Sequence, residues 1–259
     1  MVLGDPISAD SAKAGLSEAN TPQASQIQAL FDRIAPVYDQ LNDWLSLGQH
    51  RIWKKMAVKW SLAKAGDACL DLCCGTGDLT QLLARQVGRQ GQVVGVDFSS
   101  AQLAIAQQRL ATTSLQIPIT WVQADVLDLP FPKDSFAAAT MGYGLRNVTN
   151  ITRSLQELFR VLKPGAHAAI LDLNKSIDGQ IQPFQSWYLD NLVVPVARQF
   201  GLTQEYAYLG PSLERFPTSR EQIRLAHECG FTKVTHYPIA GGTMGVLVVV
   251  KPPVHLDSA

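Results

Sequence analysis

Residues 70–80 read LDLCCGTGDLT, an apolar run followed by a glycine turn and the start of a helix. A turn of this kind after a parallel strand lets the backbone approach a ligand closely. Asp71 and Asp78 flank the glycines, and Thr80 stands where a dinucleotide site usually has its third glycine. Carboxylates oppose a pyrophosphate but stabilise the sulfonium and ammonium groups of S-adenosylmethionine. The sequence therefore favours S-adenosylmethionine, with an NAD-dependent dehydrogenase as an alternative.

Short β-rich runs alternate with helical patterns from residue 67 onward, which predicts a parallel sheet covered on both faces. The clearest helix is Thr152–Leu162, which Pro164-Gly165 ends because proline cannot continue the helical ladder. The predicted class is α/β and Rossmann-like, a mostly parallel seven-stranded sheet with a C-terminal antiparallel strand. The expected strands are Cys69–Leu72, Gln92–Val96, Ile119–Gln123, Ala137–Met141, His167–Leu173, Lys233–Tyr237 and Met244–Val250, with Gly241-Gly242 turning between the last two.

Composition indicates one globular domain. The 259 residues are 46% hydrophobic and 17% charged, and no internal repeat divides them. We expect residues 1–26 to form a flexible tail and residues 27–259 a single domain. Within it, residues 27–60 are expected to form lid helices and residues 174–215 an insertion covering the substrate site.

The net charge of the chain and the length of its apolar runs limit the kinds of partner and the cellular location that we expect. The 22 basic residues balance 22 acidic ones, so nucleic acid is not expected as the main partner. Residues 1–26 lack the features of a secretory signal, and the apolar run Met244–Val250 is too short to span a bilayer, so a cytoplasmic protein is expected. The spacing of Cys69, Cys73, Cys74 and Cys229 predicts reduced core thiols and no metal site.

The residues around the glycine turn suggest how the cofactor's methionine part is held. Asp71 is the expected neighbour of the ammonium group. The backbone amides from Gly75 to Gly77 can donate to the carboxylate.

Two later strand ends suggest where the nucleoside lies. Asp97 ends the next strand and could accept both ribose hydroxyls, or it could cap a helix. Asp125 could accept from the adenine amine while Val126 packs on the ring, or Asp125 could cap its own loop.

With these residues in place, residues 27–251 resemble the ubiquinone/menaquinone biosynthesis C-methyltransferases. The segment YDQLNDWLSLGQHRIW at 38–53 is similar to that family's N-terminal signature, although Leu41 stands where methionine is usual. The segment FAAATMGYGLRNV at 136–148 is similar to its strand-four motif, and RVLKPG at 160–165 to a helix end common among class I methyltransferases. Cys73-Cys74 and the segment GGTMG at 241–245 look like the photosynthetic branch that methylates demethylphylloquinone.

The resemblance implies a function and a set of cofactor contacts. The contacts carried over are Thr80, Asp97, Asp125, Val126 and Gly142, where Gly142 replaces a frequent serine and so lacks its hydroxyl.

The implied activity is C-methylation of a prenylated naphthoquinol, demethylphylloquinol to phylloquinol, with S-adenosylmethionine as cofactor. Menaquinone, ubiquinone or plastoquinone biosynthesis and a non-catalytic methyltransferase-like module are the alternatives. A nucleic-acid or protein methyltransferase is disfavoured by the neutral charge. A homodimer and peripheral membrane contact are further expectations.

Four residues are candidates for handling the quinol. His50 could accept the ring hydroxyl's proton or be a structural helix histidine. Arg146 and Asn147 could stabilise the developing phenolate or anchor a lid. Tyr38 could hydrogen-bond a quinol oxygen or simply pack. The apolar residues of 174–215 could shield the transfer from water or be an ordinary packed insertion.

Overall fold

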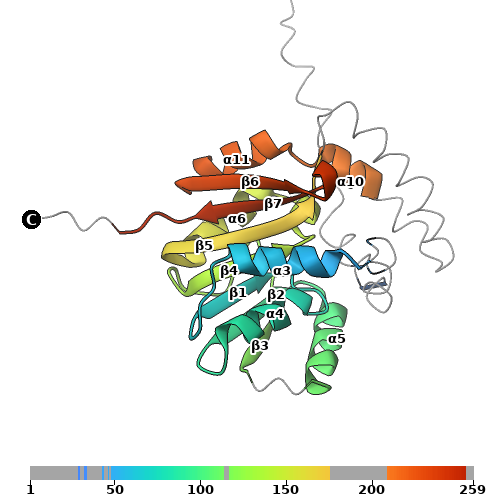
Figure 1. Ribbon diagram of the computed structural model, residues 1–259, viewed down its shortest axis with the longest axis vertical. Helices are drawn as coiled ribbons and strands as arrows, with labels where there is room; N and C mark the ends of the chain where they lie inside the picture. The colour runs from blue at the N-terminus through green and yellow to red at the C-terminus, as the bar shows by residue number, and fades with distance from the viewer. Residues whose placement is uncertain are drawn as a thin grey trace, which may run out of the picture.

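The computed structural model describes residues 29, 32, 33, 43, 46, 48–113, 117–175 and 209–254. Its centre is a seven-stranded sheet of order β3-β2-β1-β4-β5-β7-β6. Neighbours from β3 through β5 are parallel, and β7 runs antiparallel to both β5 and β6. The predicted fold class is therefore confirmed, with the antiparallel strand inserted beside the edge strand β6 (Figure 1). The strands are β1 Ala68–Leu72, β2 Gln92–Asp97, β3 Ile119–Gln123, β4 Phe136–Gly142, β5 Leu162–Leu173, β6 Lys233–Ile239 and β7 Met244–Val250.

The largest departure from the expected strands is the start of β5. The predicted helix Thr152–Leu162 is α6 at Ile151–Val161, and Leu162 already has extended dihedral angles. Leu162 pairs with Phe136, and the register shifts before Ala138. Pro164-Gly165 therefore lies within β5 and does not end the helix. Pairing with β4 ends α6 at Val161, three residues before Pro164.

Helices cover both faces of this sheet. Serine or asparagine side chains cap two of them: Ser99 accepts from the amide of Gln102, and Asn150 accepts from the amide of Arg153. The helices are α3 His50–Trp60, α4 Asp78–Val87, α5 Ser100–Ala111, α6, α10 Leu209–Arg215 and α11 Ser219–Glu228, and the short 3-10 turns are η1 Leu145–Asn147 and η3 Ala240–Gly242. The turn η3 contains the expected Gly241-Gly242 connection between β6 and β7. No described helix is long and apolar enough to cross a membrane.

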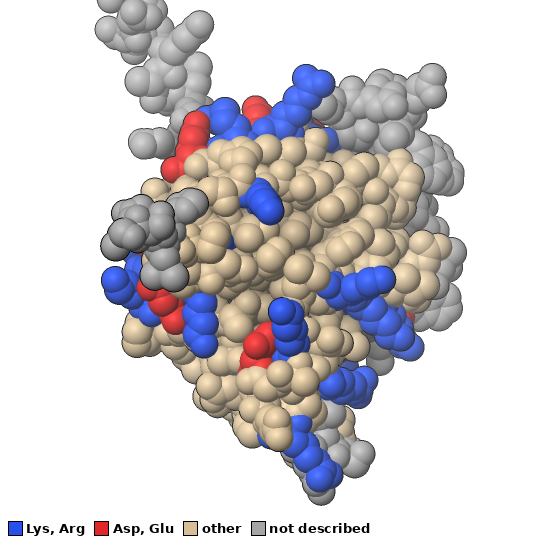
Figure 2. All heavy atoms as spheres, turned by 60° about the vertical axis from the view of Figure 1, so that its left-hand side comes forward, with Lys and Arg blue, Asp and Glu red and all other residues tan. Residues whose placement is uncertain are grey.

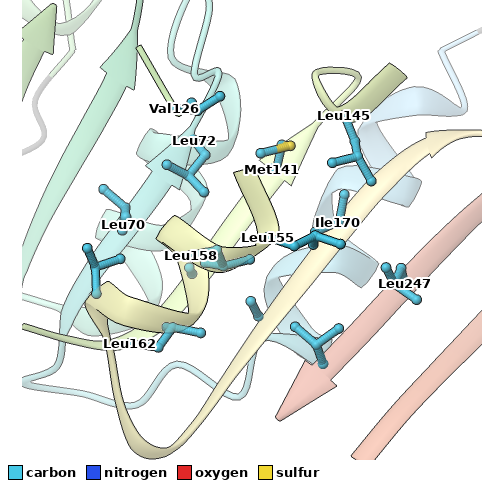
Figure 3. Packing of buried hydrophobic residues seen from close by; sticks show 14 of the residues in the cluster. Leu70, Leu72, Val126, Met141, Leu145, Leu155, Leu158, Leu162, Ile170 and Leu247 are labelled. Atoms are coloured by element: carbon cyan, nitrogen blue, oxygen red, sulfur yellow. The ribbon is translucent and has the colours of Figure 1, made fainter. Parts of the chain in front are cut away.

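The two faces of the sheet bury separate apolar layers. One layer packs α6 and α11 against the strands through residues such as Leu155, Leu158 and Ala226. Figure 3 shows Leu155 and Leu158 of α6 facing the strands. The other packs α3 and α4 through residues such as Ala57 and Leu83. Side chains alternate between the faces along β1, so Leu70 and Leu72 enter the first layer while the side chain of Asp71 points toward α4.

The strand order places a binding site at one edge. The chain runs outward from β1 to β2 and β3, and then returns to the other side of β1 with β4. Loops after β1 and β4 therefore diverge at the carboxyl edge, which leaves a crevice between them. The glycine turn follows β1 directly, so it lies at this switch point.

Candidate functional site

A cleft opens at this switch point between the loops that follow β1, β2, β3 and β4. The glycine turn, the N-terminus of α4 and η1 form its walls, and α3 contributes one side chain. Its lining residues are Lys54, Asp71, Cys73, Cys74, Gly75, Thr76, Asp78, Leu79, Asp97, Phe98, Gln102, Ala124, Asp125, Val126, Leu127, Gly142, Tyr143, Gly144, Asn147, Val148 and Thr149. Most of the predicted cofactor residues are therefore brought together in one place.

Asp71 is the most deeply buried acid of the cleft, with 0% of its surface exposed. Thr140 lies opposite it in the β1–β4 register, and the hydroxyl of Thr140 donates to Oδ1 at 2.7 Å. The hydroxyl of Thr80 donates to Oδ2 at 2.6 Å. Burial raises the pKa of Asp71 to about 7, although both hydroxyls act in the opposite direction. Asp71 can thus change its protonation state near neutral pH.

Thr80 lies behind this carboxylate rather than on the cleft wall. It is completely buried, and it is not among the lining residues. The structure therefore connects Thr80 to the cleft through Asp71.

The glycine turn keeps its shape for steric reasons. Gly77 precedes α4 with φ +86, and a Cβ there would lie 2.6 Å from the ring of Trp121. The amide of Gly75 donates to Oδ2 of Asp97 at 2.8 Å, and the amide of Gly77 donates to the carbonyl of Cys74 at 2.9 Å. Two of the backbone amides that were expected to donate to the carboxylate of the cofactor therefore already donate to acceptors within the protein.

Asp97 connects the turn to the loop after β2. Its Oδ1 accepts from the amide of Ser99 at 2.9 Å, and its Oδ2 accepts from Gly75. Ser99 is the N-cap of α5, so the helix-cap alternative for Asp97 is wrong. A carboxylate has about four acceptor positions, so two backbone donors leave capacity for further hydroxyls. Burial raises the pKa of Asp97 from its ordinary value.

Asp125 and Val126 form the far wall of the cleft. Oδ1 of Asp125 accepts from the amide of Leu127 at 2.9 Å, so the loop-capping contact is present. Asp125 is nevertheless exposed at the cleft wall, and Val126 beside it is 6% exposed. Capping and ligand contact are compatible, because Oδ2 remains for another donor.

Gly142 ends β4 at the cleft, and its neighbour explains the missing side chain. A Cβ at this position would lie 2.6 Å from Cδ1 of Leu79. Leu79 therefore fills the space that a serine would occupy, and Leu79 itself lines the cleft.

Lys54 is a cleft residue that the sequence interpretation missed. It is 6% exposed on α3, and its ammonium lies 2.7 Å from Oδ2 of Asp78. Arg109 donates to Oδ1 of the same carboxylate at 2.6 Å. Burial opposes ionisation of Asp78, but the charges and hydrogen bonds of Lys54 and Arg109 lower its pKa overall. A lysine on the apolar face of a helix, four residues after His50, was the available signal.

Of the residues predicted to handle the quinol, Asn147 lines the cleft, whereas Arg146 and His50 do not. Asn147 lines the cleft, and its Nδ2 donates to the carbonyl of Tyr143 at 3.0 Å. Tyr143, also missed from the sequence, lines the cleft with an uncommon φ of +60. Arg146 points away to a buried ion pair with Asp172 and is not among the lining residues.

His50 also lies outside the cleft lining. It is 3% exposed, its Nδ1 lies 2.8 Å from the hydroxyl of Ser46, and burial is the main cause that lowers its pKa. Tyr38 and residues 176–208 of the expected insertion lie outside the described residues.

The remaining reactive side chains of the cleft are thiols. Burial raises the pKa of Cys73 and of Cys74 well above the ordinary value, so both are protonated at neutral pH. Within the described ranges, no group of three or more metal-ligating side chains could hold a metal ion.

The cleft's donors and acceptors fit S-adenosylmethionine. Acidic side chains at three strand ends can meet its ammonium, ribose and adenine groups, and Lys54 is the basic side chain in the lining. A crystal structure of a SAM-dependent methyltransferase from Aquifex aeolicus superimposes with a TM-score of 0.60, at 17% identity, over 82% of this chain and 97% of that one. The superposition shows the fold, and the fold and cleft together fit an S-adenosylmethionine-dependent methyltransferase.

Sequence comparison gives the family. The model of the ubiE/COQ5 methyltransferase family matches residues 19–251, and this chain belongs to that family. A 2-phytyl-1,4-naphthoquinone methyltransferase of Trichormus variabilis is 63% identical over 88% of this chain and 99% of its own length. A chloroplastic 2-phytyl-1,4-β-naphthoquinone methyltransferase of Arabidopsis thaliana is 53% identical over 88% of each chain.

Proposed function

We propose that this enzyme methylates a ring carbon of a prenylated naphthoquinol, converting demethylphylloquinol to phylloquinol in phylloquinone biosynthesis. The observation that carries the proposal is the 63% identity, over almost the whole length, to a 2-phytyl-1,4-naphthoquinone methyltransferase. The same name recurs for the plant relative, so it is common to relatives of differing similarity. The cleft supports it, because its acidic side chains and Lys54 fit the charged and polar groups of S-adenosylmethionine, and Asn147 of η1 lies in the same lining.

The methionine end of the cofactor is assigned to Asp71 and Lys54. Asp71, ionised, faces the ammonium group, while Thr80 and Thr140 orient its oxygens. Lys54 receives the carboxylate, because the amides of Gly75 and Gly77 are already donated to protein acceptors. An ammonium has three donors, and Asp78 takes one of those of Lys54.

The nucleoside end is assigned to the strand ends farther along the sheet. Asp97 accepts the ribose hydroxyls on the positions that Gly75 and Ser99 leave available. Asp125 accepts from the adenine amine, and the buried side chain of Val126 packs against the ring. Gly142 allows Leu79 to fill the adjoining wall.

The acceptor ring is assigned to the end of the cleft formed by Tyr143 and Asn147. A quinol carbon becomes nucleophilic when the adjacent hydroxyl loses its proton, so a group near that oxygen must hold or receive the proton. Asn147 can orient the oxygen. Arg146 acts through its ion pair with Asp172, by fixing the η1 turn that carries Asn147. His50 positions α3, and Tyr38 stays a candidate contact to a quinol oxygen.

The direct test is methyl transfer from labelled S-adenosylmethionine under reducing conditions. Demethylphylloquinol and a demethylated benzoquinol are compared, with Asp97→Ala as the inactive control. Label in the naphthoquinol supports the proposal, and label in the benzoquinol alone moves the enzyme to another quinone pathway. No label in either, with cofactor binding retained, would leave the non-catalytic module. Equal turnover of the oxidised quinone with reductant excluded would contradict the quinol chemistry.

A further inference from the structure

The outer face of α3 carries an exposed stripe that the cofactor site does not use. Ile52, Lys55, Lys59 and Leu62 follow one another at helical spacing on this side, with Leu62 just beyond the helix end. Ile52 is 59% exposed and Leu62 is 52% exposed, so a large apolar side chain reaches solvent at each end of this stripe.

A shallow groove continues this stripe toward α4. Its floor contains Val58, Ala63 and Leu82, and its rim contains Lys55, Lys59, Lys64 and Arg85. Among the residues that the structure describes, none forms an ion pair with these four rim cations within 4.0 Å. The groove therefore combines an apolar floor with a basic rim.

The charge of this face contrasts with the neutral chain. Residues 44–66 and residues 79–96 contain no Asp or Glu, while Lys and Arg recur in both segments. Basic side chains predominate over acidic ones on the lower part of the face shown in Figure 2. A protein with zero net charge thus concentrates positive charge on the α3–α4 face.

We propose that the α3–α4 face, defined by Ile52, Lys55, Lys59, Leu62, Lys64 and Arg85, docks on an anionic lipid surface. The proposal rests on the proposed function, because a quinol with a prenyl tail partitions into a bilayer and must be taken from it. Basic residues near an anionic membrane each strengthen binding roughly fivefold, and exposed apolar side chains insert at the headgroup boundary. Ile52 and Leu62 favour lipid over RNA, which would be expected to meet stacking aromatics instead.

The same helix connects this face to the active cleft. Lys54, on the buried side of α3, lines the cleft, while Lys55 beside it is exposed on the docking side. Docking therefore holds the enzyme with α3 between the lipid surface and the sheet, and the helix begins at His50 near the cleft.

The test is co-sedimentation of the full chain with vesicles of phosphatidylcholine alone and with about 30% phosphatidylglycerol. We expect at least tenfold stronger binding to the anionic vesicles, and its loss in about 0.5 M salt, where screening is strong. Lys55→Glu/Lys59→Glu should reduce binding to the level of neutral vesicles. Ile52→Ser/Leu62→Ser should weaken binding about tenfold without changing the charge.

Lys133→Glu/Arg220→Glu is the matched control, because it makes the same change in net charge at two exposed positions outside this face. It should bind anionic vesicles within about twofold of the wild type. S-adenosylhomocysteine binding, measured by calorimetry, checks that every variant is folded. Equal wild-type binding to both vesicle types, or equal loss in the control, would overturn the proposal. Vesicle binding without methylation of any quinol would instead refute the proposed function and leave the docking face standing.

Discussion

The ammonium of Lys54 lies 2.7 Å from Oδ2 of Asp78, which joins α3 to the first turn of α4 across the mouth of the cleft. The pair sets a cation beside the glycine turn, in a lining that is otherwise acidic or uncharged. The cofactor carries one carboxylate and two cationic groups, so one lysine among several aspartates matches its charges.

Replacing Lys54 by methionine should weaken binding of S-adenosylhomocysteine by about 10- to 100-fold, the equivalent of one hydrogen bond to a charged group. Binding of the decarboxylated analogue should change by less than about threefold, because this analogue lacks the carboxylate that we assign to Lys54. Isothermal titration calorimetry of both ligands measures the difference. Lys55→Met, one residue along the same helix and exposed, is the control. Equal losses for the two ligands would show that Lys54 acts only through the fold.

Cofactor binding should strengthen as the pH rises toward about 7. Asp71 has a pKa of about 7 in the fold, so it is largely protonated at lower pH. An ammonium favours the ionised carboxylate, so binding releases a proton in this range. Calorimetry in buffers of different ionisation enthalpy reports that proton. Asp71→Asn should remove the release, and a release that persists in this variant would assign it to another group.

The same carboxyl should make the protein less stable as the pH rises from about 4 to about 7. The pKa of Asp71 is higher in the folded protein than in the unfolded chain, so the unfolded chain loses this proton at a lower pH. Each increase in pH between the two pKa values therefore stabilises the unfolded chain relative to the folded protein. Urea unfolding across this range should show a decline of up to about 4 kcal/mol in the free energy of unfolding, because a tenfold change in an acid's ionisation constant corresponds to about 1.4 kcal/mol. The profile of Asp71→Asn should be flatter, and parallel profiles would contradict the raised pKa.

Asp97→Ala should impair cofactor binding more than Asp125→Ala. Asp97 is 5% exposed and also anchors the amide of Gly75, so its removal disturbs both the ribose contact and the turn. We expect a loss of about 100-fold or more at Asp97 and about 10-fold at the exposed Asp125, from the strength of hydrogen bonds to charged groups. Fluorescence or calorimetric titration with S-adenosylhomocysteine ranks them. The reverse order would mean that the nucleoside lies differently in the cleft.

Arg146→Met should destabilise the protein by about 3–5 kcal/mol, because it leaves the buried carboxylate of Asp172 without its partner. The double variant Arg146→Met/Asp172→Leu should recover part of that loss, since neither buried charge remains. Urea unfolding at constant pH measures both. If Arg146→Met abolished methyl transfer while stability stayed at the wild-type level, Arg146 would contact the substrate directly.

The sequence alone determined the sheet and the acidic residues that line the cleft at its carboxyl edge. Alternation of apolar strands with helices fixed the α/β class, and acidic residues at successive strand ends had to meet because parallel strands end at one edge. Asp71, Asp97 and Asp125 therefore followed from local pattern and spacing. The start of β5 did not, because pairing of Leu162 with Phe136 depends on a neighbouring strand.

Only the tertiary structure decided which polar side chains enter the cleft. His50, Arg146 and Thr80 each had a plausible place in the chemistry, but Ser46, Asp172 and Asp71, respectively, hold them outside the lining. Lys54 entered the lining because α3 packs across β5 and α4, a contact that no local sequence rule predicts. The direction of a side chain depends on partners distant in the sequence, and the packing of the whole chain sets which of those partners lie within reach.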